Sequence, residues 1–176
     1  MIPSAILVAY FSRRGSNYVS GSVRDLPVGN TEVVAQMIRR LTGADLYHSE
    51  ASEPYPTGYN ETTKIAQKQL RQHARPGLLH SLANLEAYQT IILGYPNWWG
   101  TMPMPVFTFL EGSDFSGKTI LPFCTHEGSG LGRSEVDIQG ACPTARLRAG
   151  FDLVGGTVAG SERIVTTWLQ REGLLP

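Results

Sequence analysis

The sequence predicts an α/β domain with a mostly parallel sheet, because two kinds of apolar pattern alternate along the chain. Continuous apolar runs such as residues 5–11 are typical of strands that helices cover on both faces. Between these runs, apolar residues recur at helical spacing, as Val33, Val34, Met37 and Ile38 do. Strands that alternate with helices favour parallel pairing, and right-handed crossovers then place helices on both faces.

Each expected element has a local reason. The expected strands are residues 5–11, 44–48, 90–94, 119–124 and 153–158, and Pro122 counts against the fourth because proline removes a ladder donor. The first helix begins at Asn30 or Thr31, either of which can cap it, and Gly43 can end it. Later helices are expected over residues 60–74, 103–110 and 133–142 and from Ser161 onward.

Composition and charge exclude several classes of protein. The 176 residues predict one domain, residues 1–176, and a hydrophobic content of 41% argues against disorder. Lys and Arg number 15 and Asp and Glu number 15, so a nucleic-acid partner is not expected. We expect no membrane association and a cytoplasmic protein, because no apolar run is long enough to span a bilayer and Met1–Ser4 lacks the charge of a signal peptide. Cys124 and Cys142 lack C-x-x-C spacing and are expected to be buried thiols rather than a redox pair.

Three loops follow expected strands, and the carboxyl ends of parallel strands are where ligands bind in such sheets. The first loop runs from Ser12 to the helix start at Asn30 and Thr31, where backbone N–H groups favour an anion. It is interpreted as a phosphate cradle or, alternatively, as a helix cap on a surface loop. No Gly-Lys-Ser/Thr follows, so a P-loop NTPase is not expected.

The second and third loops carry different chemistry. Trp98 and Trp99 directly follow the strand at 90–94, and one of them could cover a flat aromatic ligand or form a hydrophobic lid over the next helix. The third loop, Thr125–Gly132, is rich in glycine and is interpreted as a backbone wall for a ligand or as an ordinary flexible connection. His126 and Glu127 fit a metal or catalytic pair less well, because H-E-x-x-H is absent.

An anion site, an aromatic surface and a polar wall at one sheet edge are the three features that FMN needs, since FMN joins a flat ring to a phosphate. The chain also resembles the flavodoxin family through four motifs. They are Tyr-Phe-Ser at 10–12, Gly-Asn-Thr-Glu-Val-Val-Ala at 29–35, Gly-Tyr-Pro-Asn-Trp-Trp-Gly-Thr-Met-Pro at 94–103 and Cys-Thr-His-Glu-Gly-Ser-Gly-Leu-Gly at 124–132.

The resemblance implies a doubly wound, five-stranded parallel sheet of order 2-1-3-4-5 with FMN at its switch point. It places the FMN phosphate on Ser12, Asn30 and Thr31, with Arg13 contributing through its backbone or charge. It places the flavin along Pro96, Asn97, Trp98, Trp99 and Gly100, and the polar edge of the ring among Thr125, His126, Glu127, Gly128 and Gly130. We expect Trp98 to be the stacking tryptophan. Tyr55, Pro56 and Tyr59 either border the substrate side of the flavin or pack on the sheet.

Two features depart from the family pattern. Residues 14–28 are an insertion in the phosphate loop, which either folds over the cofactor or leaves as a surface flap. The zero net charge is unlike the acidic character of small flavodoxins. The favoured function is electron transfer to or from a redox partner protein. The alternatives are an FMN-dependent NAD(P)H oxidoreductase acting on a quinone or similar small acceptor, and a non-redox module of this fold.

Overall fold

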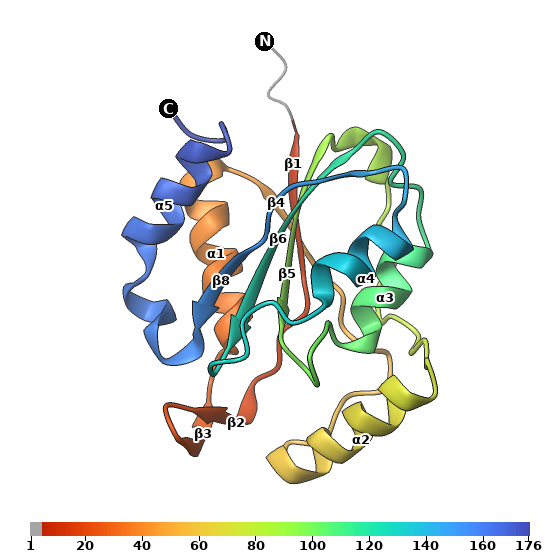
Figure 1. Ribbon diagram of the computed structural model, residues 1–176, viewed down its shortest axis with the longest axis vertical. Coiled ribbons are helices and arrows are strands. Elements are labelled where there is room, and N and C mark those ends of the chain that lie inside the picture. Colours follow the sequence, from red (N-terminus) through yellow and green to blue (C-terminus); the bar gives the residue numbers. More distant parts are fainter. Residues whose placement is uncertain (1–4) are drawn as a thin grey trace.

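A parallel sheet forms the centre of the protein, and the computed structural model describes it within residues 5–176 (Figure 1). The strand order is β4-β1-β5-β6, with β7 and β8 both beside β6. This confirms the expected α/β class and the order 2-1-3-4-5, while the expectation for Met1–Ser4 lies outside the described residues. The strands are β1 (Ile6–Tyr10), β4 (Asp45–His48), β5 (Thr90–Pro96), β6 (Thr119–His126), β7 (Arg146–Leu147) and β8 (Phe151–Val154).

The fifth position of the sheet is split at Pro122. The Arg148 N–H donates to the Ile120 carbonyl at 2.9 Å, so even-numbered residues of β6 point their backbone groups toward β7 and β8. Pro122 has no N–H to offer on that side, and it lies between the segment paired with β7 and the segment paired with β8. The expected strand over 153–158 was wrong in extent, because β8 ends at Val154 and Gly155–Gly160 form the 3₁₀ helix η2.

Helices cover both faces of the sheet, as Figure 1 shows. Helices α1 (Asn30–Thr42) and α5 (Glu162–Arg171) lie on one face, and α3 (Met104–Glu111) and α4 (Ser134–Ala141) lie on the other. The alternation of β1 explains this arrangement: Leu7 and Ala9 pack toward α3, whereas Val8 and Tyr10 pack toward α1. Helix α2 (Tyr59–Arg71) lies at the carboxyl ends of the strands, and a short 3₁₀ helix, η1 (Leu85–Ala87), precedes β5.

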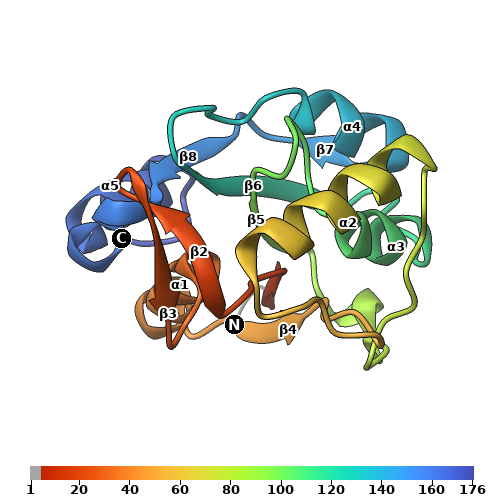
Figure 2. The ribbon, with the colours of Figure 1, turned by 90° about the horizontal axis from the view of Figure 1, so that it is seen from below.

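The insertion contains an antiparallel hairpin of β2 (Gly15–Val19) and β3 (Ser22–Leu26). Its turn residues Ser20 and Gly21 have φ of 52° and 85°, the two positive values that a type I′ turn requires. Seen from below, the hairpin lies beside α1 at the same end of the sheet as α2 (Figure 2). In residues 5–176, no helix has the length and apolar character needed to cross a membrane.

Candidate functional site

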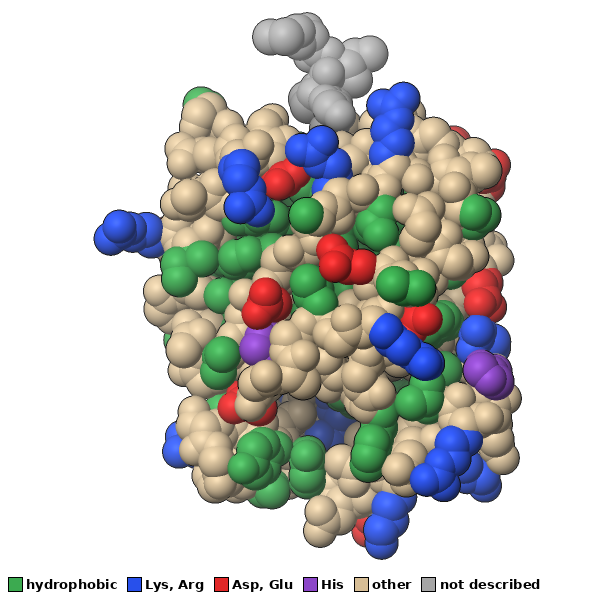
Figure 3. All heavy atoms as spheres, in the orientation of Figure 1, with side chains coloured by type: hydrophobic (Ala, Val, Ile, Leu, Met, Phe, Trp, Pro, Cys, Tyr) green, Lys and Arg blue, Asp and Glu red, His purple; other side chains and the backbone are tan. Residues whose placement is uncertain are grey.

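A cavity of about 380 Å³ opens at the carboxyl ends of the strands. Figure 3 shows this face hollowed between the hairpin and α2. The chain passes from β1 to β4 on one side and later to β5 on the other, so the cavity lies at the switch point of the sheet. Eleven of the expected site residues line it: Ser12, Arg13, Asn30, Thr31, Pro96, Asn97, Trp98, Trp99, Thr125, His126 and Glu127.

One end of the cavity is the start of α1. Ser12 Oγ accepts a hydrogen bond from the Glu32 N–H at 3.1 Å and so takes one donor of the first turn. Within residues 5–176, the N–H groups of Asn30 and Thr31 donate no hydrogen bond. A Cβ at Gly29 would lie 2.2 Å from Ser12 Oγ and 2.6 Å from the Arg13 carbonyl oxygen, so only glycine allows this close approach. Two free amides at a helix N-terminus fit an anion.

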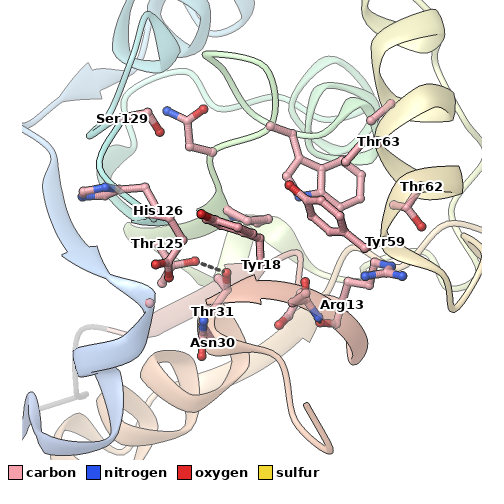
Figure 4. Close-up of a pocket in the computed structure, with 18 of the residues that line it drawn as sticks. Arg13, Tyr18, Asn30, Thr31, Tyr59, Thr62, Thr63, Thr125, His126 and Ser129 are labelled. Atoms are coloured by element: carbon pink, nitrogen blue, oxygen red, sulfur yellow. Dashed lines mark hydrogen bonds between the residues drawn. The ribbon is translucent and has the colours of Figure 1, made fainter. Parts of the chain in front are cut away.

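A buried pair of hydroxyls joins the first and third loops. The hydroxyl oxygens of Thr31 and Thr125 lie 2.8 Å apart, as the dashed line in Figure 4 marks. Each hydroxyl has one proton, and the bond between them uses only one. The second proton is therefore available to a ligand in the cavity.

Arg13 lines the cavity, but its guanidinium is occupied by protein carbonyls. It donates to the carbonyl of Ser16 and to those of Pro56, Thr57 and Gly58, which precede α2. Burial lowers the pKa of this group below its usual value. Arg13 therefore holds the base of the hairpin to the start of α2.

The second loop is a tight turn whose geometry is fixed by side chains. Trp99 and Gly100 have φ of 57° and 87°, again a type I′ pair, between the paired residues Trp98 and Thr101. The Asn97 side chain accepts from the Gly100 N–H at 2.9 Å and donates to the Gly130 carbonyl at 2.8 Å. Asn97 thus links the second loop to the third, while Gly100 itself does not line the cavity.

The two tryptophans have different environments. Trp98 packs edge-to-face against Phe11 and Tyr55, each with ring centroids 5.1 Å away. Trp99 is 50% exposed, and its indole N–H donates to the Thr63 carbonyl of α2 at 3.0 Å. Both line the cavity, and the stacking role of Trp98 stays a prediction.

The third loop forms a wall in which the His126 ring is fully engaged. The Gly128 N–H donates to Nδ1 at 2.8 Å, so Nε2 carries the proton and donates to Asp152 at 2.8 Å. Gly128 and Gly130, with φ of 126° and 61°, shape the loop but do not line the cavity. No group of three or more potential metal ligands occurs within residues 5–176.

Several lining residues were not expected as cofactor ligands. Tyr59 was expected only to border the flavin or pack on the sheet, and it lines the cavity, whereas Tyr55 packs behind Trp98. The hairpin was not expected, although the turn dipeptide Ser20-Gly21 is a sequence signal that could have indicated it. Figure 4 shows the hairpin and α2 residues around the cavity. The further lining residues are Asn17, Tyr18, Thr62, Thr63, Ala66, Ser129 and Gly155.

Comparisons with known proteins agree with this architecture. The family model for flavodoxin matches residues 5–172. A putative flavoprotein from Bacteroides eggerthii is 28% identical, with a TM-score of 0.76 over 96% of this chain and 97% of that one. A putative flavoprotein from Bacteroides uniformis is 26% identical, with a TM-score of 0.75 over 95% and 98% of the two chains. A flavoprotein in complex with FMN from Lactobacillus acidophilus shares the fold at 16% identity, with a TM-score of 0.62 over 89% and 97%. The curated protein sequences contain no match.

Proposed function

We propose that this chain, which belongs to the flavodoxin family, binds FMN in the cavity at the carboxyl ends of β1, β5 and β6 and transfers electrons through it. The observation that carries this proposal is the composition of the cavity along its length. Free helix amides and hydroxyls lie at one end, and aromatic rings lie at the other. FMN has a phosphate at one end and a flat ring at the other.

The phosphate end is formed by the start of α1. The Asn30 and Thr31 amides would donate to the phosphate, and the helix dipole favours its negative charge. Ser12 holds the first turn in place through the Glu32 N–H, and the Thr31–Thr125 pair offers one hydroxyl proton. Arg13 acts by fixing the surrounding loop rather than by offering its charge.

The ring end is formed by the second and third loops. When bound, FMN supplies the redox chemistry, because its ring accepts and releases electrons. The indoles of Trp98 and Trp99 exclude water from the ring, and the Asn97 bridge to Gly130 keeps the two loops at a fixed separation. The Thr125–Ser129 segment would face the polar edge of the ring.

Electron transfer between proteins is the favoured activity because the chain matches the flavodoxin family over residues 5–172. Both ring nitrogens of His126 are engaged by Gly128 and Asp152, so this side chain orients the loop instead of moving a proton.

One observation favours the second candidate, an FMN-dependent NAD(P)H oxidoreductase with a quinone-like acceptor. Tyr18 and Trp99 line the cavity and are 43% and 50% exposed, which suits contact with a small planar molecule.

The first test is the visible absorption spectrum of the purified protein with and without added FMN. Flavin absorbance, or its uptake on addition of FMN, is expected. A protein that stays colourless in the presence of FMN would contradict the proposal and leave the non-redox module. Adding reduced nicotinamide nucleotide then separates the two activities, since only an oxidoreductase would bleach the flavin without a partner protein.

A second test isolates the phosphate end. The double variant Ser12→Ala with Thr31→Ala is expected to weaken FMN binding at least tenfold more than riboflavin binding, because riboflavin lacks the phosphate. Thr31→Ser is the matched control, since it keeps the hydroxyl. Equal losses for FMN and riboflavin in a fluorescence titration would contradict the phosphate role of these residues.

A further inference from the structure

The β2–β3 hairpin forms the outer wall of the cavity. Asn17 and Tyr18 of β2 line the cavity, and the Tyr18 ring lies 6.2 Å from the ring of Tyr59 on α2. Strand β3 lies on the outer side, where Val23 is 53% exposed. The hairpin therefore separates the cavity from solvent on this side, and Figure 4 shows Tyr18 at the cavity.

The base of the hairpin is firmly held. The Arg13 guanidinium donates both to the Ser16 carbonyl of β2 and to the carbonyls of Pro56, Thr57 and Gly58 before α2. The Ser16 N–H donates to the Thr57 carbonyl at 3.2 Å, and the Asn17 amide donates to the Arg13 and Gly15 carbonyls at 3.0 Å each. This end of the hairpin thus moves with the start of α2.

The tip of the hairpin crosses to the opposite side of the cavity and is held by few contacts. The Ser20 N–H donates to a Glu127 carboxylate oxygen at 2.9 Å. Val19 is buried and packs near Gly156 of η2, where a Cβ would lie 3.8 Å from Val19 Cγ1. A two-stranded hairpin is only marginally stable by itself, so these tip contacts decide whether it stays closed.

We propose that the β2–β3 hairpin is a strap that closes over the cofactor cavity, with Asn17 and Tyr18 as binding residues, and that its tip must leave Glu127 and Gly156 for FMN to enter or leave. This inference rests on the proposed binding of FMN. The base acts as the hinge, because the charged guanidinium of Arg13 makes several hydrogen bonds there. The tip acts as the latch, because its hydrogen bond is the single one from the Ser20 N–H to Glu127.

The geometry of the latch allows it to be locked covalently. A Cβ at Gly156 would lie 3.6 Å from the Ser20 Cβ, within the range that a disulfide spans. The double variant Ser20→Cys with Gly156→Cys is therefore expected to form a disulfide on oxidation. The native thiols of Cys124 and Cys142 are buried and do not compete.

The test measures FMN dissociation from the loaded double variant, oxidised and then reduced. Oxidation is expected to slow dissociation at least tenfold, oxidation before loading is expected to slow uptake as much, and a thiol reductant should restore both rates. The single variants Ser20→Cys and Gly156→Cys are the controls and should not respond to oxidation. Equal rates in the oxidised and reduced double variant would overturn the strap, whereas failure of the reduced and unaltered proteins to bind FMN would overturn the proposed function.

A second pair of variants tests the latch without a crosslink. Val19→Asp places a carboxylate at the buried tip contact near Glu127 and is expected to speed FMN dissociation at least fivefold. Val136→Asp puts the same charge on the exposed face of α4, where Val136 is 73% exposed and does not line the cavity, and should leave the rate unchanged. Identical rates for both variants would contradict the tip contact as the latch, even if the disulfide did not form.

Discussion

Two type I′ turns stand on opposite sides of the cavity, and they are held in different ways. The Trp99–Gly100 turn is held by several bonds: the Gly100 N–H donates to the Asn97 side chain at 2.9 Å, and the Gly100 carbonyl accepts from the Arg133 N–H at 2.8 Å. Thr101, directly after the turn, is fully buried. The Ser20–Gly21 turn forms the tip of the hairpin, where the Ser20 N–H donates to a Glu127 carboxylate oxygen at 2.9 Å. The same backbone geometry thus occurs in two walls of the cavity. We call the second and third loops, with the Trp99–Gly100 turn, the fixed wall, and the β2–β3 hairpin the detachable wall.

This difference assigns different tasks to the two walls. A wall that contacts a redox ring must keep its distances constant, because electrostatic and stacking effects depend on position. A wall that admits a large ligand must open with a small free energy, as ligand-binding loops generally do. Substitutions on the two walls should therefore differ in whether they change the whole protein or only the strap.

The largest effect is expected for Gly132→Ala on the fixed wall. Gly132 has φ of 55°, and a Cβ there would lie 2.2 Å from the Gly100 carbonyl oxygen, so the Trp99–Gly100 turn must shift. We expect the free energy of unfolding to fall by about 3 kcal/mol. Urea denaturation measures this change.

Gly130→Ala is the matched control for that variant. Gly130 has φ of 61° but no atom within 4 Å of its Cβ position, so only backbone strain remains. A loss of about 1 kcal/mol is expected. Equal losses for the two variants would show that the contact with Gly100 does not hold the fixed wall.

The next largest effect is expected at the hinge of the strap, where Arg13 joins the base of the hairpin to the start of α2. Arg13→Lys keeps the charge but loses the planar fork that reaches the carbonyls of Pro56, Thr57 and Gly58. We expect a loss of about 2 kcal/mol in the protein without cofactor, measured by thermal unfolding. Arg14→Lys, at the exposed neighbouring residue, is the control and should leave the stability unchanged. Unaltered stability of Arg13→Lys, together with weaker FMN binding, would instead assign the Arg13 charge to the phosphate.

A smaller effect is expected from the buried thiol of Cys124 in β6. Burial raises the pKa of Cys124 from 9.0 to about 12, so the folded protein favours the neutral thiol. The free energy of unfolding is therefore unaffected by this thiol below pH 9 and falls as the pH rises above 9, by about 1 kcal/mol per pH unit. Comparing Cys124→Ala with the unaltered protein between pH 8 and 10 measures this slope. An identical slope in both proteins would contradict the burial of the thiol.

The smallest global effect is expected at the tip of the strap. Gly21→Ala strains a residue with φ of 85° but displaces nothing. Amide hydrogen exchange in β2 and β3 should become about fivefold faster, since the strain is about 1 kcal/mol and opening of the strap is local. The melting temperature should not change. If the free energy of unfolding instead falls as much as for Gly130→Ala, the strap unfolds together with the sheet.

The central fold was predictable because buried strands and amphipathic helices differ in apolar period. Residues 5–11 and 90–94 are continuous apolar runs, and both became inner strands. The fifth position was predicted less well, because β7 is only Arg146–Leu147 and carries no periodic pattern. The effect of Pro122 on its neighbours was visible only once the direction of its missing N–H was known.

The candidate site was predictable where it follows the ends of inner strands. The strap was not expected as a hairpin, because β2 and β3 are largely polar and exposed and lack an apolar face to reveal alternation. Its latch joins Ser20 to Glu127, 107 residues apart, and no local pattern encodes such a contact. No local pattern could show that the Arg13 guanidinium bonds to the carbonyls of residues 56–58, since these come from another loop.

The break in the sheet at Pro122 also bears on how the protein behaves at high concentration. An unbroken outer strand beside β6 would present a row of free backbone groups to another molecule, and long flat edges of this kind recruit further strands. Here the outer position consists of β7 and β8, which are two and four residues long and separated by residues 148–150. A second molecule finds no continuous ladder to extend, so an apolar strand as long as β6 can be kept without inviting fibril growth at this edge.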